Sequence, residues 1–175
     1  MTSRIKTLFK TMLACACAGL SLLAWQASAQ TLSSPLPAGQ GAGVHGAASP
    51  FAPLAERNDV LAWSVLTAVK TKTVKNRILP AFDAGQLALD QKTQRIQGFM
   101  MPLEPGEKQR HFLLSSVPLT CAYCVPGGPE SMVEVRTKTP VKYGMEPVVV
   151  EGKFLVLNDD SYGLYYRMTD ATPIK

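Results

Sequence analysis

The feature that most constrains the fold is a series of short segments separated by proline- and glycine-containing turns. Apolar and polar residues alternate within these segments, as is typical of half-buried β-strands. Gly98 and Gly152 each lie inside such a segment and fit the bulges or bends that close small barrels. A small barrel or a sandwich accommodates these strands, and we predict a mainly β, OB-like barrel of five to six strands. The predicted strands are residues 73–79, ended by Pro80, then 94–101, 111–117, 132–136, 148–157 and 162–168.

One N-terminal helix is predicted ahead of the strands. Asn58 or Asp59 can cap it, and apolar residues over 60–69 recur at helical spacing. Lys70 and Lys72 would then lie at its carboxyl end, where the helix dipole favours cations. We expect this helix to dock on the sheet.

The first 29 residues predict export. Three basic residues precede an uncharged stretch over 11–25, and Ala27-Ser28-Ala29 is the small-residue pattern that signal peptidase cuts. The stretch is shorter than the roughly 20 residues that cross a bilayer, so we expect cleavage after Ala29, a periplasmic protein and no membrane span in it. Cleavage removes three of the 18 Lys and Arg and none of the 13 Asp and Glu, so the net charge falls from +5 to about +2. A nearly neutral mature chain gives no support to a nucleic-acid partner.

The mature chain divides into a leader and one domain. Residues 30–53 are rich in Ser, Pro, Gly and Ala and carry no charge, a composition that predicts a flexible leader. His45 is predicted to be a solvated residue of this leader. Residues 54–175 have the length of a single domain and form the predicted OB-like β domain.

One loop holds the residues with distinctive chemistry. Signal cleavage leaves two cysteines, Cys121 and Cys124, and such a pair in an oxidising compartment forms a disulfide by default. The two thiolates could instead contribute to a zinc or copper site, with His111 as a third ligand. Thiol–disulfide exchange is a third interpretation, but it favours a following helix, which this proline- and glycine-rich loop does not allow. The predicted surface of the loop consists of Tyr123, Pro126, Gly127, Gly128 and Pro129.

Enzyme motifs are otherwise missing from the sequence. No glycine-rich phosphate loop connects a strand to a helix, and no nucleophile-elbow pattern surrounds Ser115 or Ser116. We therefore expect a protein that is not an enzyme.

The order of several motifs is distinctive. Residues 98–103 read Gly-Phe-Met-Met-Pro-Leu, residues 112–114 read Phe-Leu-Leu, and residues 121–129 join the cysteines to a proline-rich loop. With Met-Val-Glu-Val at 132–135, these motifs resemble a family of small exported bacterial proteins of unknown function. The resemblance covers about residues 59–170.

The resemblance has implications for the cysteine loop and for partners. Many members of that family carry Cys-x-His before a run of prolines, where this chain has Cys121 and Cys124. A metal site tolerates such an exchange, whereas a structural disulfide does not. Family genes adjoin transporters of the lipoprotein-exporter type and zinc-responsive genes, which implies an envelope ABC-type transporter or another periplasmic protein as partner.

These observations give three ordered expectations for function. The first is a non-catalytic periplasmic accessory protein of envelope transport or metal homeostasis, which binds a thiophilic metal ion through the cysteine loop. The alternative is a peptide- or protein-binding module with a structural disulfide. A thiol–disulfide oxidoreductase is third.

Overall fold

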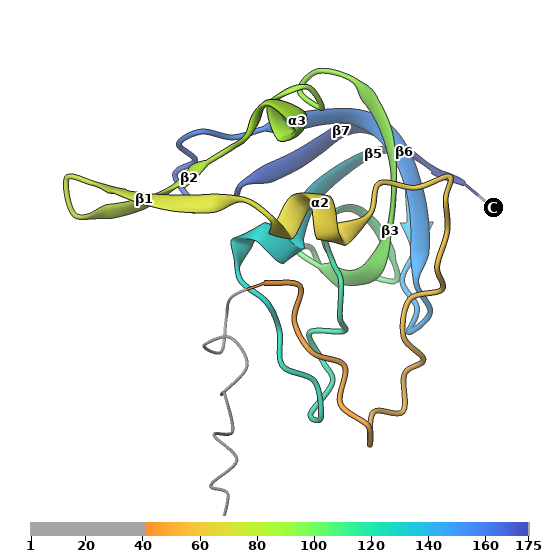
Figure 1. Cartoon of the computed structure of the whole chain (residues 1–175). Helices are drawn as coiled ribbons and strands as arrows, with labels where there is room; N and C mark the ends of the chain where they lie inside the picture. Colours follow the sequence, from red (N-terminus) through yellow and green to blue (C-terminus); the bar gives the residue numbers. More distant parts are fainter. Residues whose placement is uncertain (1–40, 175) are drawn as a thin grey trace, which may run out of the picture. The chain divides into compact units, whose positions relative to one another are not determined.

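A computed structural model of the protein describes residues 41–174, and the predicted signal peptide lies outside the described residues. Figure 1 shows the elements along the described chain. In order they are α2 (Trp63–Thr67), β1 (Lys70–Val74), β2 (Arg77–Ala81), α3 (Ala84–Leu87), β3 (Thr93–Pro102), β4 (Lys108–Ser115), the 3-10 helix η1 (Pro129–Ser131), β5 (Met132–Lys142), β6 (Val148–Val156) and β7 (Tyr166–Ile174).

Five strands close a barrel in the order β3-β4-β5-β7-β6 (Figure 1). Strands β5 and β7 run parallel, and the other neighbouring pairs are antiparallel. A five-stranded Greek-key barrel is the architecture of the OB fold. The predicted mainly β, OB-like barrel is therefore confirmed.

The hydrophobic core fills the inside of the barrel because apolar residues alternate along its strands. On β5, for example, Val133 and Val135 point inward while Glu134, between them, points to the outer face. The helix α2 packs on the same core through Leu66, whose carbonyl accepts a hydrogen bond of 2.8 Å from the Tyr166 hydroxyl. The fully buried core residues are Leu66, Ile96, Phe112, Leu114, Val133, Val135, Val150, Phe154, Tyr166, Met168 and Ala171.

The predicted helix is real but much shorter than expected. It begins after Ala62, which makes no side-chain cap, and the predicted cap Asp59 binds Arg57 instead. Leu61 donates its N–H to the carbonyl of Arg95, so the chain before the helix runs along β3. These tertiary contacts override the helical periodicity. A second helix, α3, was not predicted, although Asp83 and Gln86 form a complete capping box at its start.

The prediction of one strand over residues 73–79 is wrong, because the chain reverses within it. Lys75 and Asn76 both adopt positive φ, at 46° and 65°, as the two-residue turn of a β-hairpin requires. The result is the two-stranded sheet β1–β2, in which Pro80 pairs with Thr71 instead of ending the strand. The last strand, β7, likewise begins four residues later than the 162–168 prediction and continues to Ile174.

Gly152 lies at an irregularity of the barrel. The register between β6 and β7 shifts between Glu151 and Lys153, which confirms the predicted bulge. Gly98 is required for a different reason, since a Cβ there would lie 2.9 Å from the Ser115 carbonyl oxygen. Over residues 41–174, no helix is both long and apolar enough to span a membrane.

Candidate functional site

The two cysteines lie in the loop between β4 and η1. Their Sγ atoms are 2.20 Å apart, at disulfide distance. Two turns position them, since Cys121 donates its N–H to the carbonyl of Pro118 and Cys124 donates to that of Cys121. A helix does not follow the pair, as the proline- and glycine-rich sequence predicted. The arrangement is a short covalent ring within an irregular loop.

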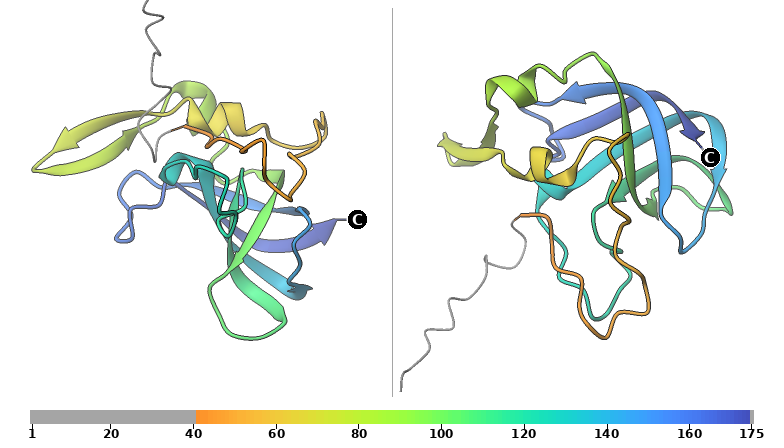
Figure 2. Two further views of the ribbon diagram at one scale, coloured as in Figure 1. Left: turned by 90° about the horizontal axis from the view of Figure 1, so that it is seen from below. Right: turned by 45° about the vertical axis from the view of Figure 1, so that its right-hand side comes forward.

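Residues 41–51, assigned to the leader, lie along this loop (Figures 1 and 2). Val44 and Val125 exchange both backbone hydrogen bonds, at 2.8 and 2.9 Å, as an antiparallel bridge. The Ser49 hydroxyl lies 3.3 Å from Cys121 Sγ and 3.5 Å from Cys124 Sγ. The domain surface thus extends N-terminal of the predicted boundary at residue 53, because backbone pairing supplies contacts that the composition of the leader does not reveal.

His45 is not a solvated leader residue, contrary to the prediction. Its Nε2 lies 2.7 Å from the carbonyl oxygen of Phe51, and its ring lies 6.3 Å from that of Phe99. Phe99 points to the outer face of β3, yet it is only 4% exposed because His45 and Phe51 cover it. Residues 41–51 therefore cover an aromatic side chain that the barrel alone would leave in water.

The predicted loop surface is correct in part. Tyr123 is 61% exposed, and Pro126 and Pro129 are exposed as well. Gly127 and Gly128 are buried instead. A Cβ at Gly127 would overlap the carbonyl oxygen of Gly41, so glycine permits this close backbone approach.

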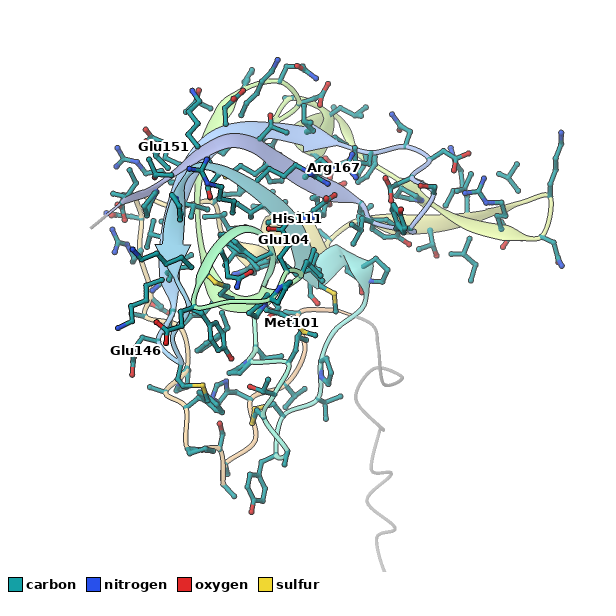
Figure 3. All side chains as sticks on the ribbon, turned by 180° about the vertical axis from the view of Figure 1, so that it is seen from behind. Met101, Glu104, His111, Glu146, Glu151 and Arg167 are labelled. Atoms are coloured by element: carbon teal, nitrogen blue, oxygen red, sulfur yellow. A yellow bond between two sulfur atoms is a disulfide. The ribbon has the colours of Figure 1, made fainter. Side chains whose placement is uncertain are left out.

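His111, the predicted third metal ligand, belongs to a different cluster on the outer face of the barrel (Figure 3). Its Nε2 lies 2.7 Å from Glu134 Oε1, and its Nδ1 lies 3.7 Å from a Glu104 oxygen. Arg167 donates from Nε to Glu134 Oε2 at 2.5 Å, and Arg136 donates to Oε1 at 3.1 Å. These side chains meet because β4, β5 and β7 are neighbours in the barrel.

Electrostatics stabilise the charged form of this cluster. Burial disfavours the Glu134 carboxylate and is the largest single influence on its pKa. Hydrogen bonds from Arg167 and His111 and the charges of Arg167 and Arg136 together outweigh burial, so the pKa of Glu134 lies below its ordinary value. Burial likewise opposes ionisation of Asp160, but backbone N–H groups of the following loop and Arg167 lower its pKa.

The structure does not bring the predicted metal ligands together. Within residues 41–174, no three His, Cys, Asp or Glu side chains form a group that could hold a metal ion. Zinc or copper binding by Cys121, Cys124 and His111 therefore stays a prediction without geometric support. Glu134 and Arg167 were not predicted, although a lone glutamate between Val133 and Val135 in a strand is a signal of an outward-facing charge.

Removal of the disulfide should destabilise the protein modestly. Closing a ring of this size constrains the unfolded chain by about 2 kcal/mol in the chain-entropy model. We expect Cys121→Ser/Cys124→Ser to lower the free energy of unfolding by about that amount in urea titrations, and to speed proteolysis within residues 41–51. Unchanged proteolysis of that segment would contradict a role of the disulfide in holding it.

Two comparisons with known proteins find a match to this chain. A family model described as protein of unknown function (DUF3299) matches residues 53–170. One solved structure, of a DUF3299 family protein from Pseudomonas aeruginosa PAO1, is 31% identical over 55% of this chain and 68% of that chain, with a TM-score of 0.41. No curated protein matches the chain.

Proposed function

This chain belongs to the DUF3299 family of proteins of unknown function, and from that premise we propose that it is an exported accessory protein that binds a peptide or protein partner. The contact surface, here called the loop face, consists of Val44, Tyr123 and Val125. In this proposal the disulfide holds the binding loop and does not exchange or bind metal.

The observation that carries the proposal is exposed apolar surface on a restrained loop. Val44, Tyr123 and Val125 are 54%, 61% and 45% exposed. The disulfide and the backbone bridge between Val44 and Val125 restrain the segments that carry them. Restraint before binding reduces the conformational entropy lost on binding, and exposed tyrosine is enriched in contact surfaces.

A cleft beside Phe51 and Phe99 adds a second contact region. Its volume is about 620 Å³, and its lining is rich in proline, aromatic and methionine side chains. Phe51, Phe99 and Met145 line it, and Met145 is 53% exposed. An apolar cleft of this size accommodates a few side chains of a peptide. The expected partner is therefore a periplasmic protein with an exposed apolar segment, such as an envelope transporter component.

Site-specific photo-crosslinking in the periplasm tests this proposal. A photoreactive phenylalanine analogue at position 123, and separately at 125, should yield an adduct with the same single partner, identified by mass spectrometry. The matched control is position 162, where Tyr162 is 87% exposed in the loop before β7. No adduct at 123 and 125, or the same adducts at 162, would overturn the proposal.

Metal analysis of the same preparations separates this proposal from the metal interpretation. We expect no zinc or copper above the level found in Cys121→Ser/Cys124→Ser. Near-stoichiometric metal that disappears in this variant would instead establish the cysteine pair as a metal site.

A further inference from the structure

The hairpin β1–β2 extends away from the barrel and pairs with no other described strand (Figures 1 and 2). Every residue of β1 is exposed, and Ile78 on β2 is 70% exposed. An isolated two-stranded hairpin is marginal in water, and an unpaired strand edge is a template for another strand. We propose that the outer edge of β1 binds an extended, acidic segment of a partner protein as a third strand.

The register of the hairpin identifies which backbone groups are free. Val74 and Arg77 flank the two-residue turn and form a hydrogen-bonded pair, so Thr73 and Thr71 occupy the alternate, non-hydrogen-bonded positions. Their N–H and C=O groups therefore point away from β2. Within residues 41–174 neither threonine makes a backbone hydrogen bond outside the hairpin.

The other edge of the hairpin is unsuitable for a third strand. Pro80 is opposite Thr71, so it also occupies a non-hydrogen-bonded position. A residue there would direct its N–H to the outer edge of β2, but proline has no N–H to donate. The partner strand is thus expected beside β1.

Charge determines the chemistry of the partner. The hairpin carries Lys70, Lys72 and Lys75, and no Asp or Glu occurs between Asp59 and Asp83. Its fourth cation, Arg77, is already paired with Asp159. The hairpin thus carries more positive charge than the whole chain after residue 29, whose net charge is about +2. A partner with acidic side chains complements this surface.

The alternation of β1 predicts a pattern in that partner. Lys70, Lys72 and Val74 share one face of the hairpin. A third strand beside them would present acidic residues at two alternate positions and an apolar residue at the next. A second copy of the chain offers β1 no acidic complement, and antiparallel pairing of β1 with itself centred on Thr71 or Lys72 would oppose lysine with lysine. Residues 30–40 contain no Asp or Glu and offer no charge complement.

A designed peptide tests the inference on the mature protein. The probe has glutamate at two alternate positions, valine at the next alternate position, and threonine at the positions between them. A probe with lysine in place of glutamate is its control. Two-dimensional amide NMR should show saturable shifts at Thr71 and Thr73 with the glutamate probe only. The affinity of the protein for the glutamate probe is expected to fall at least tenfold between about 50 and 200 mM salt.

Two variants separate strand pairing from charge attraction. Thr73→Pro removes an outward N–H without changing charge or a hydrogen bond of the hairpin, and should weaken probe binding at least tenfold. Lys70→Glu/Lys72→Glu should weaken it at least as much. Lys108→Glu/Lys142→Glu makes an equal charge change at exposed barrel positions. Its affinity for the probe should stay within about threefold of the wild type.

Several results would overturn the inference. One is that the glutamate probe shows no saturable binding. Another is that Thr73→Pro binds the probe as tightly as the wild type does. Shifts of the β1 amides that depend only on protein concentration would indicate a second copy instead. Binding of the hairpin to phosphatidylglycerol vesicles without binding of the probe would indicate a lipid surface.

Discussion

Glu134→Gln should lower the free energy of unfolding by about 3 kcal/mol, because it removes the charge of a buried carboxylate that Arg167, Arg136 and His111 contact. Glu134 is only 5% exposed and accepts hydrogen bonds from Arg136 and Arg167 while contacting His111. Glutamine preserves the shape of the side chain but supplies no charge to the two arginines. Urea unfolding of the wild type and the variant at pH 7 measures the difference.

Glu151→Gln is the matched control for that prediction. Glu151 also points outward from a barrel strand, and it forms an ion pair of 2.5 Å with Arg95. Both partners of this pair are more exposed than Glu134, with side-chain exposures of 33% and 42%. Exposed pairs contribute about 0–1 kcal/mol, so the control should change stability by less than about 1 kcal/mol. Similar losses in the two variants would contradict the special role of the buried cluster.

The effect of Glu134 should depend on pH. Because the pKa of Glu134 is lowered in the folded protein, its carboxylate stabilises the fold above its ordinary pKa of 4.5. That stabilisation is lost as the pH falls through the lowered folded-state pKa. The difference between wild type and Glu134→Gln should therefore be largest at neutral pH and smaller at pH 3. A constant difference across this range would show that ionisation of Glu134 is not responsible.

Gly152→Ala should destabilise the barrel by about 2 kcal/mol, the range expected for overpacking a well-packed site. A Cβ at this bulge would lie 2.8 Å from both Ala171 Cα and the Thr169 carbonyl oxygen. Both are backbone atoms of β7, so relief requires the strand to move. Thermal unfolding by circular dichroism measures the loss.

Gly144→Ala serves as the control for this substitution. No atom lies within 4 Å of a Cβ built at Gly144, so alanine meets no obstacle there. Its stability should stay within about 0.5 kcal/mol of the wild type or rise slightly, because alanine reduces the entropy of the unfolded chain. A loss at Gly144 as large as that at Gly152 would show that close packing of β7 is not the cause.

Local patterns were sufficient for most of the barrel strands. The strand predicted over 94–101 corresponds to β3, and that predicted over 148–157 corresponds to β6. One strand was wrongly predicted over residues 73–79, because their alternation continues through Lys75 and Asn76. Alternation alone does not distinguish a long strand from two short ones. The helix failed for a different reason, since Asp59 pairs with Arg57 and Arg95 instead of capping it.

The candidate site, too, was predicted only in part. A disulfide between Cys121 and Cys124 was one of three interpretations of the sequence, and the sulfur distance is that of a disulfide. His111 was placed with them only because few other ligands were available. Its actual neighbour, Glu134, lies on the next strand and is 23 residues away in the chain.

Local patterns were enough to predict the mainly β barrel and the bulge at Gly152, because each depends on alternation or spacing over a few residues. In contrast, the folded structure was needed to show that residues 41–51 cover Phe99 and pair with the cysteine loop, and that His111 joins Glu134 and Arg167. These contacts join segments separated by tens of residues. Their partners are selected by the closure of the barrel, which no local pattern specifies.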